Sequence, residues 1–171
     1  MHRVLILMGS DSDLRVMKGA ADALAELGIP SEVRITSAHR TPEKTAQLVA
    51  SAAAQGFGVI IAGAGGAAHL PGVVAAATTL PVIGVPIASG ALNGADALHA
   101  IVQMPKGIPV GTVAIDGAYN AGLLAAQILA VDDADLADRL RAYRRTLAEQ
   151  VEEKDRRLQE SGIAGYLSQQ R

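Results

Sequence analysis

Apolar and polar positions along the chain form blocks that predict a strand followed by a helix, five times in succession. Runs rich in β-branched residues predict strands at Arg3–Met8, Glu32–Thr36, Gly58–Ala62, Val82–Val85 and Val110–Ile115. Helix-length segments follow at Leu14–Leu27, 41–56, His69–Thr79, Ala95–Gln103 and Tyr119–Val131. Because the first, third and fourth runs lack polar alternation, they are typical of parallel strands covered on both faces. The pattern predicts an α/β fold, a three-layer αβα sandwich on a parallel five-stranded sheet.

The pattern changes after Val131, where 17 of the 32 charged residues fall in the last 40 positions. Apolar residues recur there at spacings of three, four or seven, which predicts one apolar stripe on a long charged helix. The stripe consists of Leu136, Leu140, Tyr143, Leu147, Val151 and Leu158. We therefore divide the chain into a single α/β catalytic domain (1–131) and a charged amphipathic C-terminal helix and tail (132–171). This helix could pack on its own domain, but the pattern favours packing on a neighbouring subunit.

Composition narrows the possible functions. Half of the residues are hydrophobic but only 2 % are aromatic, so Ala, Val, Ile and Leu must build the core. The net charge of −2 and the absence of a basic stripe argue against nucleic acid as a partner. The chain has no cysteine, which excludes disulfides, thiol catalysis and Cys-based metal sites. With no run of membrane-spanning length and no signal-peptide pattern, we expect a cytoplasmic protein with no membrane partner.

Three polar segments each follow a predicted strand closely. They are 9–13 (Gly-Ser-Asp-Ser-Asp), 37–42 (Ser-Ala-His-Arg-Thr-Pro) and 63–69 (Gly-Ala-Gly-Gly-Ala-Ala-His). Because the carboxyl ends of parallel strands meet at one edge of a sheet, we expect the three loops to converge there. Together they would form a small-molecule site with an anion-binding group and a titratable group, as in an enzyme.

The first segment has two interpretations. Ser12 or Asp13 could simply cap the following helix by accepting hydrogen bonds from its first amides. Alternatively, Ser10 and Ser12 could contact a phosphate at a helix N-terminus, while Asp13 accepts hydrogen bonds from ribose hydroxyls. The pattern alone leaves both open.

The second segment indicates chemistry more strongly. The guanidinium of Arg40 can bind phosphate oxygens through two hydrogen bonds. The neighbouring imidazole of His39 can gain or lose a proton near neutral pH, and so can act as an acid or a base. Thr41 and Pro42 predict the start of the next helix directly after this pair.

The third segment offers mainly backbone. The spacing of Gly65 and Gly66 does not match the dinucleotide-binding fingerprint. These glycines could serve close packing of a helix on the sheet, or form a wall for a flat ring. His69 could be a second polar contact to that ring or only a helix-start residue. No histidine pair at metal-binding spacing and no accompanying carboxylate cluster occurs, so we predict no metal site.

Several ordered motifs closely resemble the family of N5-carboxyaminoimidazole ribonucleotide mutases, the PurE-type catalytic subunit of phosphoribosylaminoimidazole carboxylase. The motifs are 9–13, 37–42, Ile60–Gly72, Pro81–Pro86 and Ile101–Pro105, and the likeness continues through 107–115 and 120–129. It covers residues 3 to 130 in order, whereas the charged tail is poorly covered. Thr-Pro after His-Arg resembles the mutase class rather than the animal-type carboxylase.

The resemblance implies a flavodoxin-like sandwich that assembles as a homo-octamer, with active sites built from more than one subunit and with no cofactor. It implies that His39 is the catalytic acid and base, and that Ser10, Asp13 and Arg40 bind the substrate. It further implies that the same pocket is lined by Ser37, Ala38, Gly65, Gly66, His69 and Leu70.

The expected function is an isomerase of de novo purine biosynthesis that moves a carboxyl group from an exocyclic nitrogen to a ring carbon of aminoimidazole ribonucleotide. Two alternatives remain at this point. A carboxylase that uses free carbon dioxide would share the fold and the site. A non-catalytic nucleotide-binding module would share the fold, but it would have no need of His39 beside its phosphate clamp.

Overall fold

The computed structural model describes residues 2–169 and contains one parallel five-stranded sheet with the strand order β2-β1-β3-β4-β5. The strands are β1 (Arg3–Met8), β2 (Ser31–Ile35), β3 (Phe57–Gly65), β4 (Val82–Ile87) and β5 (Gly111–Thr112). The α-helices are α1 (Leu14–Glu26), α2 (Pro42–Ala52), α3 (Leu70–Ala76), α4 (Ala95–Val102), α5 (Ala118–Leu129) and α6 (Ala134–Ser168). Three short 3₁₀ turns adjoin them, η1 (Asp11–Asp13), η2 (Ala53–Gln55) and η3 (Ala130–Asp132).

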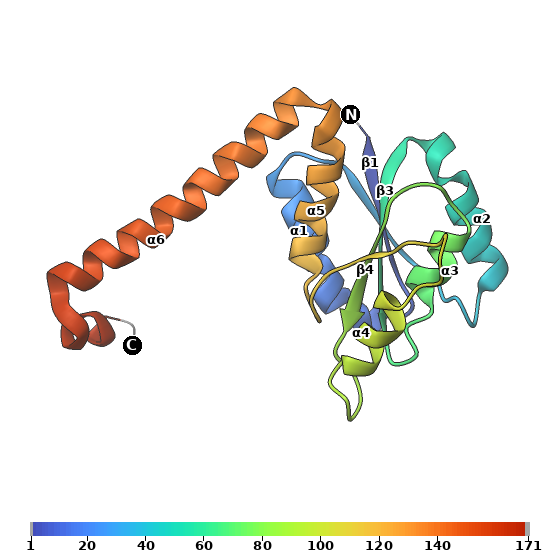
Figure 1. Cartoon of the computed structure of the whole chain (residues 1–171), viewed down its shortest axis with the longest axis horizontal. Helices are drawn as coiled ribbons and strands as arrows, with labels where there is room; N and C mark the ends of the chain where they lie inside the picture. The colour runs from blue at the N-terminus through green and yellow to red at the C-terminus, as the bar shows by residue number, and fades with distance from the viewer. Residues whose placement is uncertain (1, 170–171) are drawn as a thin grey trace.

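Helices cover both faces of the sheet, so the predicted three-layer sandwich is confirmed (Figure 1). The even-numbered residues of β1, such as Ile6, pack with α1, α5 and the start of α6. The odd-numbered residues, such as Leu7, pack with α2, α3 and α4. Because side chains alternate across a strand, this arrangement needs apolar residues at consecutive positions, which explains the uninterrupted apolar runs of the central strands.

The edge strand β5 and the central strand β3 differ most from the sequence prediction. β1 has the predicted bounds, but β5 spans only Gly111–Thr112 instead of Val110–Ile115. β5 is an edge strand that pairs only with β4. Because no strand pairs with its other side, most of the predicted apolar run lies outside the paired positions of the sheet. β3 extends to Gly65, three residues past its predicted end, because it pairs on both sides, with β1 and with β4. Part of the expected glycine loop is therefore strand.

The long charged helix is confirmed as α6, which leaves the body of the molecule and projects from it (Figure 1). Two consecutive hydrogen bonds link the first part of α6 to α5 and to α1. Tyr143 of α6 donates to the hydroxyl of Tyr119 in α5 (3.3 Å), and Tyr119 donates to Glu26 in α1 (2.5 Å). The Glu26 carboxylate holds this hydroxyl proton and so raises the pKa of Tyr119. At Gly162 the backbone turns to φ 63° and breaks the helix direction. The proposed units 1–131 and 132–171 meet close to η3; residues 1, 170 and 171 lie outside the described residues.

No helix within residues 2–169 has the length and apolar character needed to cross a bilayer.

The contact between α1 and α5 depends on the missing side chain of Gly122. A Cβ atom at this position would lie 2.7 Å from the carbonyl oxygen of Ala20 and 2.9 Å from the Cβ of Ala23. Gly122→Ala should therefore lower the free energy of unfolding by about 1–3 kcal/mol, because the helices must separate. In an unobstructed helix the same change would raise the free energy of unfolding by up to about 1 kcal/mol. The sign of the change in stability therefore tells whether the helices are in close contact at this position.

Chemical denaturation measures this change. Gly111→Ala is the matched control, since its new Cβ would meet nothing closer than the Val82 carbonyl at 3.7 Å. We expect that variant to stay within about 0.5 kcal/mol of the parent chain. An increase in stability for Gly122→Ala would contradict the proposed close approach.

Candidate active site

The three polar loops converge at the carboxyl ends of β1, β2 and β3, where they enclose a cavity of about 350 Å³. This place lies beside the switch point between β1 and β3, at which open α/β sheets bind ligands. All eleven residues predicted for the site line this cavity. They are Ser10, Ser12, Asp13, Ser37, Ala38, His39, Arg40, Gly65, Gly66, His69 and Leu70.

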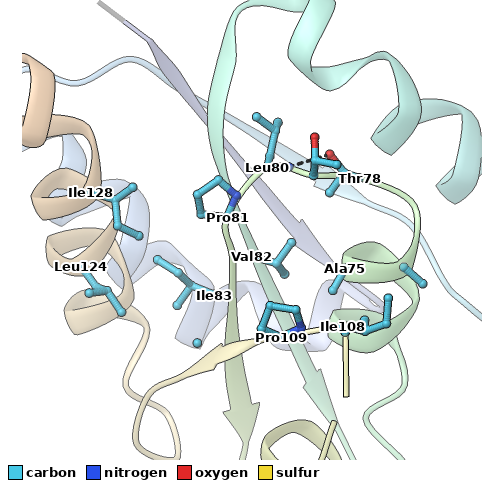
Figure 2. A pocket seen from close by; sticks show the side chains of 14 residues that line it. Ala75, Thr78, Leu80, Pro81, Val82, Ile83, Ile108, Pro109, Leu124 and Ile128 are labelled. Carbon is cyan, nitrogen blue, oxygen red and sulfur yellow. Dashed lines mark hydrogen bonds between the residues drawn. The ribbon is translucent and has the colours of Figure 1, made fainter. Parts of the chain in front are cut away.

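A larger cavity of about 570 Å³ opens at the opposite end of the strands, near the amino end of β4 (Figure 2). Its walls are apolar side chains of β4 and α5, including Ile83, Leu124 and Ile128, together with Ile108 and Pro109. None of its lining residues has an ionisable side chain. Acid–base chemistry therefore belongs to the smaller, polar cavity.

The first loop is held by its own hydroxyl groups. Ser10 Oγ accepts hydrogen bonds from the Ser12 amide (3.3 Å) and the Ser12 hydroxyl (2.9 Å), so Ser10 rather than Ser12 or Asp13 caps η1. Asp13 makes no side-chain cap to α1. Burial raises the pKa of the Asp13 carboxyl, and this outweighs hydrogen bonds from the Ser10 backbone and the Ser12 side chain, which lower it. A half-buried carboxylate without a cap remains available as an acceptor.

The second loop is tied to the first by Arg40, whose Nη2 donates to the carbonyl of Gly9 at 2.9 Å. Its backbone amide donates to Ser37 Oγ (3.1 Å), and its Nε lies 3.4 Å from the same oxygen. Thr41 stands at the N-cap of α2 as predicted, but its hydroxyl bonds to the backbone of Ser37 instead of capping the helix. The loop is thus braced, and the guanidinium is fixed at the rim of the cavity.

The third loop presents backbone because a side chain has no room at Gly65 and would be strained by the backbone conformation at Gly66. A Cβ on Gly65 would lie 2.7 Å from Ser89 Oγ, and Gly66 has a left-handed backbone with φ +58°. Ala68 also has a positive φ of 45°, which costs a residue with a side chain of order 1 kcal/mol. This strained residue precedes His69, which stands at the N-cap of α3.

The two imidazoles meet in the cavity. Nε2 of His39 lies 2.6 Å from Nδ1 of His69, with the rings nearly perpendicular at 76°. One nitrogen must donate and the other accept, so a single proton lies between them. His69 begins α3, as one of its two interpretations held, and its side chain contacts the candidate acid; its contact with a ligand ring stays a prediction. Both side chains are exposed in the single chain.

Three further lining residues, Gly9, Ala64 and Ala68, lie in the predicted segments but were given no role of their own, whereas Ser89 lies outside these segments and was missed. Ser89 matters most, because its hydroxyl accepts a hydrogen bond from the Gly66 amide at 3.1 Å. The signal was present, since Ser89 follows β4 and β4 pairs with β3. The rule that selected the other three loops would also have selected this one. Within residues 2–169, no three His, Asp or Glu side chains gather closely enough to hold a metal ion.

Comparisons with known proteins agree with this geometry. Residues 3–150 match the family model described as AIR carboxylase. The chain is 58 % identical over 164 residues to the N5-carboxyaminoimidazole ribonucleotide mutase of Pyrococcus horikoshii, covering 96 % of this chain and 93 % of that protein. It is 54 % identical to the enzyme of the same name from Thermotoga maritima, covering 99 % of both chains.

Among solved structures, Treponema denticola PurE superposes with a TM-score of 0.85 at 33 % identity, covering 92 % of this chain and 99 % of that one. The similarity extends through the α/β body and through the loops that form the polar cavity. The chain therefore belongs to the AIR carboxylase family.

Proposed function

We propose that the chain converts N5-carboxyaminoimidazole ribonucleotide into 4-carboxyaminoimidazole ribonucleotide, a step of purine biosynthesis. The relatives that carry the mutase name match this chain at 53–58 % identity and over more than nine tenths of their own lengths. The contact between His39 and His69, beside Arg40 in one polar cavity, carries the proposal. A cytoplasmic location is part of the proposal and rests on the biosynthetic role.

The charges of the cavity suggest how the nucleotide binds. Arg40 and the hydroxyls of Ser10 and Ser12 bind the 5′-phosphate, since a guanidinium and neutral donors suit a dianion. Asp13 accepts hydrogen bonds from the ribose hydroxyls, because a carboxylate repels phosphate. The imidazole ring then lies against the backbone of Gly65 and Gly66. The remaining wall of the ring site consists of Ser37, Ala38, His69 and Leu70.

The carboxyl transfer uses one acid–base group twice. Protonated His39 gives its proton to the carbamate nitrogen, the N–C bond breaks, and carbon dioxide and the free amine form. The ring carbon then attacks carbon dioxide, and neutral His39 removes the proton from that carbon. His39 ends each turnover protonated, which suits an isomerisation with no net proton change.

His69 supports this cycle through its contact with His39. An imidazole at 2.6 Å can accept a hydrogen bond from His39 or donate one to it, and so can stabilise either state. It also orients the His39 ring, as a second group orients the base in other acid–base sites.

The two alternatives fit less well. A carboxylase that uses free carbon dioxide would have the same cavity, and one relative at 52 % identity is named a carboxylase, but the relatives at 53–58 % identity are named mutases. A pure binding module would gain nothing from two facing imidazoles next to its phosphate clamp. The mutase reaction is therefore the function that fits best, and the carboxylase is the second candidate.

Carbon dioxide must stay in the site between the two steps, yet His39 and His69 are exposed in the single chain. A second copy that covers the cavity would meet this requirement. The single chain also leaves apolar groups uncovered, namely the larger cavity near β4 and the stripe on α6, where Leu147 is 43 % and Val151 is 64 % exposed. We propose a homo-octamer in which the helix and tail 132–171 pack on a neighbouring subunit.

Replacing His39 by Asn tests the chemistry. Asn keeps a hydrogen-bonding side chain of similar reach but cannot carry the proton, so turnover should fall by about 10³-fold or more. Nucleotide affinity, measured by calorimetry, should stay within about threefold. His99→Asn, an exposed residue of α4 that does not line the polar cavity, is the control and should keep full activity. An active His39→Asn variant would remove this residue from the mechanism.

Asp13→Asn separates stability from binding. Because burial raises the pKa of Asp13, the folded chain disfavours its carboxylate, and the charge costs stability at all pH values above that pKa. The variant should melt about 1–2 °C higher at pH 7, and the gain should vanish as pH falls through the raised pKa. Its substrate KM should rise about 10- to 100-fold, because a charge-assisted hydrogen bond to ribose is lost. Equal KM values for both proteins would contradict the ribose role.

Assembly is tested by the solution mass. The parent chain should have a mass of about eight times 17.5 kDa in light scattering after size exclusion. Changing both Leu147 and Val151 to Glu should produce smaller species, because charges would interrupt an apolar interface. The exposed Glu149→Gln variant is the control. If α6 packs on no neighbour, the double variant will keep the parent mass.

A further inference from the structure

A second polar cavity lies on the other side of Arg40 from the imidazole pair. It has a volume of about 440 Å³, and it shares four residues with the candidate active site: Gly9, Ser10, Ser37 and Arg40. Its remaining lining residues are Asp11, Ile35, Thr41 and Lys44. Two of the three proposed phosphate-binding residues, Ser10 and Arg40, therefore stand between two cavities, and only one of these cavities contains His39 and His69.

The two cavities differ in charge. Beside the shared Arg40, the cavity with the imidazoles contains the Asp13 carboxylate. The second cavity contains the Lys44 ammonium and the Asp11 carboxylate. A phosphate dianion therefore meets a second cation that plays no part in the proposed proton transfer only in the second cavity.

Arg40, between the two cavities, and Lys44, in the second cavity, each keep hydrogen-bond donors that no other residue of the described range uses. Arg40 uses Nη2 for Gly9 and Nε for Ser37, which leaves Nη1 without an intramolecular acceptor within residues 2–169. In the same described range, Lys44 has no hydrogen-bond or ion-pair partner for its ammonium. Lys44 lies in the first turn of α2, directly after the loop that Ser37 and Thr41 brace. Its position relative to Arg40 is therefore well defined.

We infer that Lys44 is a further substrate-binding residue, the second cation for the 5′-phosphate. The phosphate lies at the border of the two cavities, with Arg40 on one side and Lys44 on the other. The ribose and the imidazole extend from there toward Asp13 and His39. This inference rests on the proposed function for the identity of the nucleotide.

Removing the charge of Asp11 should change phosphate binding in the opposite direction to removing the charge of Lys44. Its carboxylate lies in the same cavity and accepts a hydrogen bond from the Ser10 hydroxyl at 3.1 Å. It therefore repels the phosphate and competes for one of the phosphate donors. Removing its charge should improve phosphate binding, while removing the charge of Lys44 should weaken it.

The experiment compares Lys44→Gln, Lys44→Arg, Asp11→Asn and the control Lys106→Gln, which removes one exposed positive charge from a loop that lines neither cavity. Lys44→Gln should raise KM about 5- to 20-fold with little change in kcat, and Lys44→Arg should restore most of the loss. Asp11→Asn should lower KM about two- to threefold. For the dephosphorylated ribonucleoside, kcat/KM should be the same in the parent and in Lys44→Gln.

Increasing salt should reduce kcat/KM of the parent more steeply than that of Lys44→Gln. Parent-like KM values in Lys44→Gln would overturn the inference. Equal losses for nucleotide and ribonucleoside would also overturn it, because they would mean that Lys44 only supports the fold.

Binding of ribose 5-phosphate by calorimetry separates this inference from the proposed function. If the parent chain shows no turnover, the proposed reaction fails. The role of Lys44 still stands if Lys44→Gln binds ribose 5-phosphate about 5- to 20-fold more weakly than the parent. Equal affinity for ribose 5-phosphate in the two proteins would overturn the role of Lys44 whatever the activity.

Discussion

The structure depends on one constraint, which is that all strands of the sheet run parallel and both of its faces are covered. In a parallel sheet the carboxyl ends of all strands lie on the same side, so the loops that follow them meet there although they are far apart in sequence. Covered faces require apolar residues at consecutive strand positions, which leaves no place for polar groups within the central strands. Functional side chains are therefore confined to the loops and helix starts that follow the strands. The small residues that let α1 and α5 approach closely, such as Gly122, maintain this arrangement.

The sequence was sufficient for the layers, the central strands and the convergence of three loops, because hydrophobic periodicity and strand direction determine them. Ser89 and Lys44 were missed for different reasons. Ser89 follows a strand but stands in no conspicuous motif, whereas Lys44 reads as an ordinary surface charge on a helix. The His39–His69 contact joins residues 30 positions apart, and no local pattern reports that distance. The short β5 and the break at Gly162 likewise depend on neighbours that periodicity does not describe.

The site concentrates features that do not favour folding. Burial disfavours the Asp13 carboxylate, and Ala68 has a left-handed backbone. Such features persist where the surrounding structure holds them, and they are common at sites of chemistry. In this chain the braces are local hydrogen bonds, above all those of Ser37 and of Arg40 with Gly9. In the proposed assembly, a neighbouring copy would both close the site over the exposed imidazoles and cover the projecting α6.

The central claim is that the carboxyl group moves within one site instead of passing through solution. The most direct measurement uses substrate with a ¹³C-labelled carbamate in buffer that contains unlabelled bicarbonate. Carbon NMR then follows the label during turnover. The account predicts that the label reaches the ring carboxylate with little dilution. An unlabelled product would instead show that the enzyme takes free carbon dioxide, and the absence of any product would contradict the proposed reaction itself.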